Sequence, residues 1–192
     1  TTSAICLILS PFRRGFSSTL RNVPFGVSFV AAPSAPSFRA VMVDLSVIVV
    51  SWNVCDLLRR CLCSISNVQH RASSTEVIVV DNASTDGSVE MVRAEFPDVR
   101  LIVNPGNPGF AAANNQGIAV AQGRYVLLLN PDTEVVGDAP ATMVAFADEH
   151  LDVGVVGPQL LNPDGSVQSS RRRFPTLATA FFESTWLQPY AP

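Results

Sequence analysis

From residue 45 onwards, two kinds of hydrophobic pattern alternate along the chain. Short runs of aliphatic and β-branched residues predict buried strands, and longer segments with an apolar residue every three or four positions predict amphipathic helices. The predicted strands span residues 45–50, 76–80, 99–103, 125–129 and 153–156.

Helices are predicted in the segments between these strands. The first has Leu57, Leu58, Cys61, Leu62 and Ile65 at helical spacing. The second is capped by Ser84 or Thr85 and ends before Pro97. The third is a helix of small residues over 110–121, ended by Gly123, and the fourth spans 138–150. Strands that alternate with helices favour right-handed crossovers, so we predict an α/β fold with a mostly parallel, Rossmann-like sheet flanked by helices.

Polar clusters follow three of the predicted strands, at residues 51–53, 81–82 and 130–132. Because ligands of open parallel sheets bind outside the carboxyl ends of the strands, the three clusters together predict a binding site. A single aspartate at such a place more often caps a turn or a helix, so the prediction depends on the whole set.

The clusters carry side chains suited to a charged, aromatic ligand. Asp81 and Asp132 can accept hydrogen bonds from a ribose or base, or ligate a hard cation such as Mg²⁺ or Mn²⁺. Trp52 can stack on a nucleobase, with a rim or core aromatic as the alternative. A cation would offset the charge of a pyrophosphate, because the chain has no lysine.

Composition excludes several other classes of function. All 13 basic residues are arginines, which removes P-loop and Schiff-base lysines, and the net charge of −3 argues against a nucleic-acid surface. There is no GxGxxG motif. Four cysteines without a CxxC pair predict free thiols, and no apolar run reaches the roughly 18 residues that span a bilayer.

The polar clusters and the segments around them resemble a known family. The similarity is carried, in order, by residues 47–53, 79–88, 107–117 and 127–132, and it covers about 43–175. These motifs resemble family 2 glycosyltransferases with the GT-A fold, and in particular the rhamnosyltransferase-like members of bacterial cell-surface polysaccharide pathways.

The resemblance implies an inverting transfer of a sugar from a dTDP- or UDP-linked donor to a saccharide or lipid-linked acceptor, with Mg²⁺ or Mn²⁺. It places Trp52 near the nucleobase and Asp81 at the base and ribose. Asp132 then ends the segment that corresponds to the metal-binding DxD motif, with Asn130 in place of its first acid, and is the expected metal ligand. The full set of residues expected at the nucleotide is Ser51, Trp52, Asn53, Asp81, Asn114, Asn130 and Asp132.

We expect three segments. Residues 1–41 contain four arginines and no acid, and three interpretations stay open: sequence upstream of a true start at Met42, an organellar transit peptide, or a real but floppy extension. We expect residues 1–41 to be a disordered or non-native extension, and none of the first 40 residues to pack as part of the sheet. Residues 42–175 form the nucleotide-sugar-binding domain, and 176–192 begin an acceptor-side segment. No catalytic base is assigned, because Glu183 is the only late acid and lacks the family's motif, so the fold is expected to be incomplete at its C-terminal side.

Two alternatives to a sugar transferase remain. One is a catalytically incompetent fragment that only binds a nucleotide sugar. The other is a sugar-phosphate nucleotidyltransferase, against which the missing lysine and the missing glycine-rich phosphate loop count. The resemblance implies a cytoplasmic protein and leaves open a peripheral contact with the inner face of the membrane.

Overall fold

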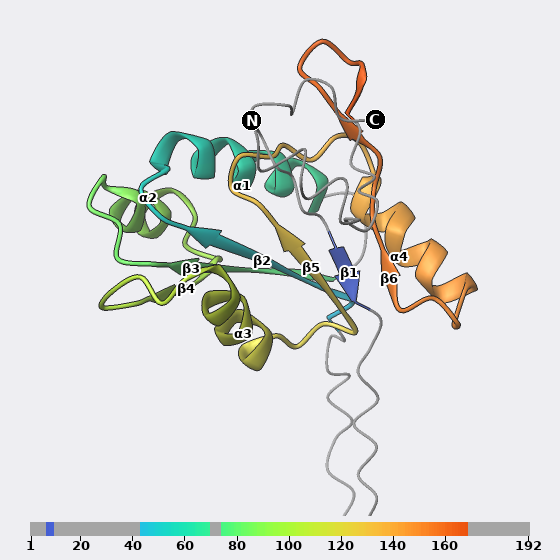
Figure 1. The fold of residues 1–192 in the computed structure, drawn as a ribbon, viewed down its shortest axis with the longest axis horizontal. Coiled ribbons are helices and arrows are strands. Elements are labelled where there is room, and N and C mark those ends of the chain that lie inside the picture. Colours follow the sequence, from blue (N-terminus) through green and yellow to red (C-terminus); the bar gives the residue numbers. More distant parts are fainter. Residues whose placement is uncertain (1–6, 10–42, 70–73, 169–192) are drawn as a thin grey trace, which may run out of the picture. The chain divides into compact units, whose positions relative to one another are not determined.

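The structure is a computed structural model, and it describes residues 7–9, 43–69 and 74–168 (Figure 1). Its larger described unit contains a six-stranded sheet and four helices. In chain order they are β1 (Leu7–Leu9), β2 (Leu45–Ser51), α1 (Cys55–Gln69), β3 (Thr75–Asp81), α2 (Ser88–Glu95), β4 (Arg100–Val103), α3 (Phe110–Val120), β5 (Tyr125–Leu129), α4 (Ala139–Glu149) and β6 (Val155–Val156).

The sheet has the strand order β4-β3-β2-β5-β1-β6. β4, β3, β2 and β5 pair in parallel, and a helix separates each of these strands from the next along the chain. This confirms the predicted α/β fold with a mostly parallel sheet flanked by helices. The parallel pairing also brings the carboxyl ends of β2, β3 and β5 to one edge of the sheet.

β1 joins this sheet, so the expectation that none of the first 40 residues does so is wrong for Leu7–Leu9. It pairs antiparallel with β5 on one side and with β6 on the other. Without β1, the described residues would leave the outer side of β5 as an open edge of unpaired backbone groups, which an extended apolar segment can pair with. The rest of the 1–41 segment lies outside the described residues, and its interpretation as an extension stays a prediction.

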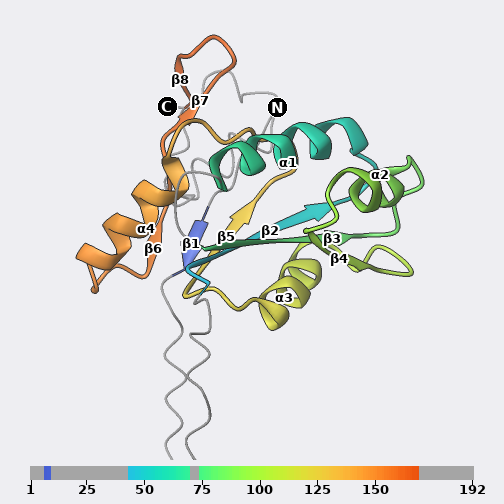
Figure 2. The same ribbon diagram turned by 180° about the vertical axis from the view of Figure 1, so that it is seen from behind.

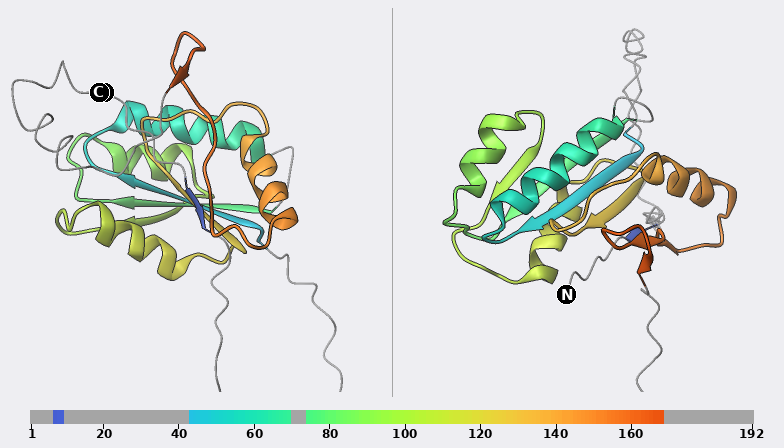
Figure 3. Two further views of the ribbon diagram at one scale, coloured as in Figure 1. Left: turned by 45° about the vertical axis from the view of Figure 1, so that its right-hand side comes forward. Right: turned by 90° about the horizontal axis from the view of Figure 1, so that it is seen from above.

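The two faces of the sheet carry separate hydrophobic cores, because side chains alternate along each strand. Along β2, Val47 and Val49 face the core that includes residues of α1, α2 and α4, whereas Ile48 and Val50 face the core that includes Ala113 of α3. The views in Figures 2 and 3 show α1 and α2 on one face of the sheet and α3 on the other.

The start of α2 differs from the prediction. The helix begins at Ser88 after Gly87, which has a left-handed φ of 85°. Ser84 and Thr85 do not cap it, because they hydrogen-bond instead to Asn53 in the loop after β2. The last predicted strand is also shorter than expected, since β6 spans Val155–Val156 rather than residues 153–156.

A second compact unit begins at Gln159. Its described part is an antiparallel pair of short strands, β7 (Leu160–Leu161) and β8 (Val167–Gln168). The hydrophobic pattern did not predict this hairpin, although Asp164-Gly165 between the strands is a typical turn dipeptide. The predicted boundary after residue 175 lies outside the described residues.

Cys55 and Cys63 agree with the predicted free thiols, since neither forms a disulfide. Cys6 lies outside the described residues. Among the helices that the structure describes, none is long and apolar enough to cross a membrane.

Gly123 fixes the connection between α3 and β5 at the edge of the sheet opposite the polar clusters. Its N–H donates to Ser46 Oγ at 2.8 Å. A Cβ atom at Gly123 would lie 2.5 Å from the backbone nitrogen of Ser46 and 2.8 Å from the carbonyl carbon of Leu45. These are backbone atoms of a central strand, so they cannot move aside cheaply.

We therefore expect Gly123→Ala to lower the free energy of unfolding by about 1–3 kcal/mol, the usual cost of overpacking. Urea unfolding of the whole chain measures it. Gly154→Ala is the matched control, since a Cβ there meets no atom within 4 Å. Equal unfolding midpoints for the two variants would contradict the close approach of Gly123 to β2.

Candidate functional site

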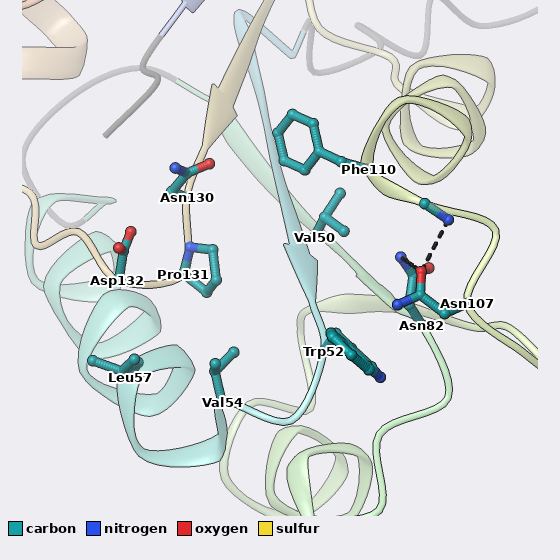
Figure 4. Close-up of a pocket in the computed structure, with 11 residues that line it drawn as sticks. Val50, Trp52, Val54, Leu57, Asn82, Asn107, Phe110, Asn130, Pro131 and Asp132 are labelled. Carbon is teal, nitrogen blue, oxygen red and sulfur yellow. Dashed lines mark hydrogen bonds between the residues drawn. The ribbon is translucent and has the colours of Figure 1, made fainter. Parts of the chain in front are cut away.

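A pocket of about 530 Å³ lies at the carboxyl ends of β2, β3 and β5 (Figure 4). Residues from four separate chain segments line it, which is the arrangement expected where loops of a parallel sheet converge. The lining residues are Val50, Trp52, Val54, Leu57, Asn82, Asn107, Gly109, Phe110, Asn130, Pro131 and Asp132.

The pocket has two chemically different sides. Figure 4 shows Asn130, Pro131 and Asp132 on one side, and Trp52 with Asn82 and Asn107 on the other. One side therefore offers a carboxylate, and the other offers an aromatic ring and amide groups. The apolar side chain of Val50 lies between them.

Asp132 is held in a turn that follows β5. Thr133 fixes this turn by donating both its N–H, at 3.2 Å, and its Oγ, at 2.7 Å, to the carbonyl oxygen of Asn130. Asp132 Oδ1 is buried and has no hydrogen-bond partner among the described residues. A buried carboxylate oxygen without a partner is costly, so a cation or a donor group of a ligand would stabilise it.

The chemistry of Asp132 fits a hard divalent cation. The described residues contain no group of three or more His, Cys, Asp or Glu side chains that would enclose a metal ion. Mg²⁺ does not need such a group, because it is often bound by one or two carboxylates together with phosphate oxygens of the substrate and water. Asp132 therefore suits a cation that arrives with a phosphorylated ligand.

Asp81 ends β3 and is almost fully buried, with 1% of its surface exposed. Its Oδ1 accepts the N–H of Ser84 at 2.8 Å, whereas Oδ2 has no partner among the described residues. The hydroxyl of Ser51, the residue opposite Asp81 on β2, is also buried and without such a partner. Neither residue lines the pocket, but Asn82, which follows Asp81, does.

Trp52 is 57% exposed although it lies in a tightly held loop. The next residue, Asn53, has a left-handed φ of 52°. Its N–H donates to Ser84 Oγ at 2.9 Å, and its Oδ1 accepts the N–H of Thr85 at 2.8 Å. These bonds clamp the loop after β2 to the loop after β3, so the indole is presented on a fixed backbone.

Asp86 completes this clamp. Its Oδ2 accepts the N–H of Cys55 at 2.8 Å, and its Oδ1 accepts both the N–H and the hydroxyl of Ser88. Desolvation raises the pKa of Asp86, but the hydrogen bonds from the Ser88 hydroxyl and from the backbone of Cys55 and Ser88 together outweigh it. The pKa of Asp86 is consequently lowered from its usual value.

Three of the predicted site residues line the pocket: Trp52, Asn130 and Asp132. Asn53 and Asn114 are engaged elsewhere, Asn53 in the loop clamp and Asn114 through a bond from its Nδ2 to the carbonyl oxygen of Phe110 at 2.9 Å. For these two, as for Ser51 and Asp81, a contact with a nucleotide stays a prediction.

Sequence reasoning assigned no chemistry to two polar lining residues, Asn82 and Asn107. Both belong to segments that carry the family resemblance, and Asn82 directly follows the predicted strand-end aspartate. The family resemblance therefore already pointed to their position near the site. It did not point to their hydrogen-bonding roles, because an amide side chain can serve as donor or acceptor and only its neighbours decide which.

Comparison with known proteins gives a family match over most of the chain. The family model described as Glycosyl transferase family 2 matches residues 46–190. An N-acetylglucosaminyl-diphospho-decaprenol L-rhamnosyltransferase from Mycobacterium tuberculosis is 31% identical over 144 residues, which cover 69% of this chain and 46% of that protein. An uncharacterized glycosyltransferase, YibD of Escherichia coli, is 35% identical over 113 residues, which cover 57% of this chain and 32% of YibD. The chain thus spans about a third to a half of the length of these relatives.

Solved structures similar to this chain include TarS of S. aureus. Residues 1–349 of TarS in complex with UDP match with a TM-score of 0.51 and 26% identity, covering 56% of this chain and 33% of that one. The complex of the same protein with UDP-GlcNAc gives a TM-score of 0.50 and 28% identity, covering 56% of this chain and 32% of that one. These matches confirm the Rossmann-like GT-A fold that the sequence resemblance implies.

The clamp should weaken in acid. Because the pKa of Asp86 is lowered in the folded protein, its contribution to stability is present above the unfolded value near 3.8 and is lost as pH falls through the folded value. Asp86→Asn has no such titration. We expect the stability advantage of the wild type over Asp86→Asn to shrink as pH is lowered from 7 to 3, as measured by urea unfolding.

The expected change is small, because Asp86 is exposed. Asp98→Asn serves as the control, since Asp98 is also exposed and makes no hydrogen bond to another described residue. A pH-independent difference between the wild type and Asp86→Asn would show that the Asp86 carboxylate does not support the clamp.

Proposed function

The chain belongs to glycosyl transferase family 2, and we propose that it binds the nucleotide-diphosphate sugar from which the whole protein transfers a glycosyl group with inversion. The observation that carries this proposal is the two-sided pocket at the carboxyl ends of the strands. A nucleoside diphosphate has an aromatic base at one end and a negatively charged diphosphate at the other. The pocket offers Trp52 on one side and Asp132 on the other, and the buried Oδ1 of Asp132 has no hydrogen-bond partner among the described residues.

On this proposal, the nucleobase stacks on the indole of Trp52. The ring is exposed toward solvent and its loop is clamped, so little conformational freedom is lost when a base binds. The buried Oδ2 of Asp81 and the Ser51 hydroxyl, which lie at the ends of neighbouring strands, would receive hydrogen bonds from the base or ribose.

Asp132 would hold Mg²⁺ or Mn²⁺ together with the diphosphate, with Asn130 beside it. The bound cation would offset the negative charge that develops on the departing nucleoside diphosphate. This role falls to a metal ion because the chain contains no lysine that could lie against the phosphates.

The donor sugar that we propose is rhamnose or a similar hexose, linked to dTDP or UDP, and the acceptor is a saccharide or a lipid-linked saccharide. In support, a relative is named as a rhamnosyltransferase acting on a diphospho-decaprenol-linked acceptor, and TarS has been solved with UDP and with UDP-GlcNAc. A lipid-linked acceptor would bring a cytoplasmic protein to the inner face of the membrane. The catalytic base stays unassigned.

Calorimetric titration with UDP and dTDP, with and without Mg²⁺, tests the metal ligand. We expect Mg²⁺ to tighten binding to the wild type, and Asp132→Asn to lose this gain while its affinity without Mg²⁺ is retained. Asp152→Asn is the matched control, because Asp152 is exposed and does not line the pocket. An unchanged Mg²⁺ gain in Asp132→Asn would remove Asp132 as the metal ligand.

The same titration tests the stacking surface. Trp52→Ala should weaken nucleoside diphosphate binding by about 1–3 kcal/mol, with or without Mg²⁺, since base–aromatic stacking is worth that much in other proteins. Trp52→Phe should recover part of the loss. If Trp52→Ala binds UDP and dTDP as tightly as the wild type, the base does not stack on this ring.

A further inference from the structure

Four side-chain amides form a continuous hydrogen-bonded chain beside the aromatic side of the pocket. Asn107 Oδ1 accepts from the backbone N–H of Gly109 at 2.9 Å and from Asn82 Nδ2 at 3.2 Å. Asn82 Oδ1 in turn accepts from Asn104 Nδ2 at 2.9 Å, and the same nitrogen donates to Gln116 Oε1 at 2.9 Å. Asn104 and Asn82 are buried, at 8% and 2% exposure.

One backbone group sets the direction of this whole chain. The N–H of Gly109 can only donate, so the atom of Asn107 that faces it must be the amide oxygen. Asn82 must then approach that oxygen with its nitrogen, which turns its own oxygen toward Asn104. None of these amides can be reversed alone without placing two oxygens or two nitrogens against each other.

The local backbone holds Asn107 in this orientation. The bond from Gly109 to the Asn107 side chain closes a turn around Pro108, whose ring restricts φ. Gly109 itself has a φ of 89°, a left-handed conformation that glycine adopts without steric cost. Asn107 is therefore oriented before a ligand binds, although its side chain is exposed.

The consequence for the pocket is a fixed donor. Both lone pairs of Asn107 Oδ1 are used by Gly109 and Asn82, and Asn107 Nδ2 has no partner among the described residues. Asn82 and Asn107 both line the pocket on the side of Trp52. Asp81, next to Asn82, does not itself line the pocket, but its buried Oδ2 has no partner among the described residues and can accept a hydrogen bond.

Nucleobases differ in whether one edge of the ring can pair with a hydrogen-bond donor that lies beside a hydrogen-bond acceptor. Uracil, thymine and guanine carry a carbonyl oxygen next to a ring N–H. Cytosine and adenine carry an amino group next to an unprotonated ring nitrogen, which is the reverse pattern. A carbonyl would receive the Asn107 N–H, whereas an amino group would face it donor to donor.

We propose that Asn107 is a specificity-determining residue that makes the pocket select a base whose carbonyl oxygen lies next to a ring N–H, and that Asn104 is a positioning residue that keeps Asn82 donating to Asn107. This inference rests on the proposed function, since it concerns the base of the same nucleotide. Asn104 does not line the pocket, so it acts only by fixing the amide of Asn82.

The test compares UDP with CDP, which have the same size and charge and differ at this edge of the base. With Mg²⁺ present, calorimetry on the wild type should show UDP binding about 10- to 100-fold more tightly than CDP, the effect of one mismatched, desolvated polar contact. Asn107→Asp keeps the oxygen that accepts from Gly109 and Asn82 but replaces the free amide by a second acceptor. Its UDP-to-CDP affinity ratio should fall to about one or below.

The UDP-to-CDP affinity ratio separates an effect on base selection from an effect of the added negative charge. The added negative charge of Asn107→Asp repels both diphosphates equally and cancels in the ratio. Asn115→Asp is the matched control, because Asn115 is exposed on α3 and lies outside the pocket lining. It should keep the wild-type ratio. Loss of the ratio in the control, or an unchanged ratio in Asn107→Asp, would overturn the inference.

Asn104→Ala tests the positioning role. It should lower the UDP-to-CDP ratio at least about threefold, because Asn82 is then free to turn its amide. If Asn104 has a purely structural role, Asn104→Ala will lower the melting temperature and leave the UDP-to-CDP ratio unchanged. That result would refute the positioning role. If the wild type binds UDP and CDP equally, the inference alone is wrong. If it binds neither, the proposed function is wrong and the inference falls with it.

Discussion

The parallel register of β2 with β3 and β5 is the constraint on which the rest of the structure depends. It places Ser51 opposite Asp81 and Val49 opposite Leu129, so the polar residues that follow each apolar run reach the same edge of the sheet. A slip of one residue would move each side chain out of the core in which it packs to the opposite face of the sheet, and would separate Ser51 from Asp81. The two hydrophobic cores therefore hold the register, and the register builds the site.

At that edge the structure tolerates polar groups that folding alone would not favour. Asp81 Oδ2, Asp132 Oδ1 and the Ser51 hydroxyl are buried without a partner among the described residues. Each such group costs stability, and each lies at the end of a strand beside the pocket. The left-handed backbone of Asn53, in the loop after β2, and of Ala83, in the loop after β3, adds strain at the same edge of the sheet. Unmet hydrogen-bonding capacity and strain that gather in one place are typical of a site prepared for a ligand.

Two sets of cross-loop bonds keep this edge in shape. The clamp around Asn53 and Asp86 joins the loops that follow β2 and β3. The amide chain from Gln116 through Asn104 and Asn82 to Asn107 joins α3, the end of β3 and the loop after β4. The side chains that a nucleobase would contact are thus held in place before it binds, so binding would cost little side-chain entropy.

The sequence by itself determined the elements of the parallel sheet, because strand and helix periodicities are local properties of a few consecutive residues. It also determined the edge at which Trp52, Asn130 and Asp132 meet, since parallel strands must end on the same side. Only the tertiary structure decided that β1 pairs with β5 and β6, and that Ser84 and Thr85 bind Asn53 instead of capping α2. It also decided that Asn107 presents a donor. The strand pairing and the bonds to Asn53 depend on partners distant along the chain, and the direction of the Asn107 amide depends on its bonds to Gly109 and Asn82, which residue type alone does not specify.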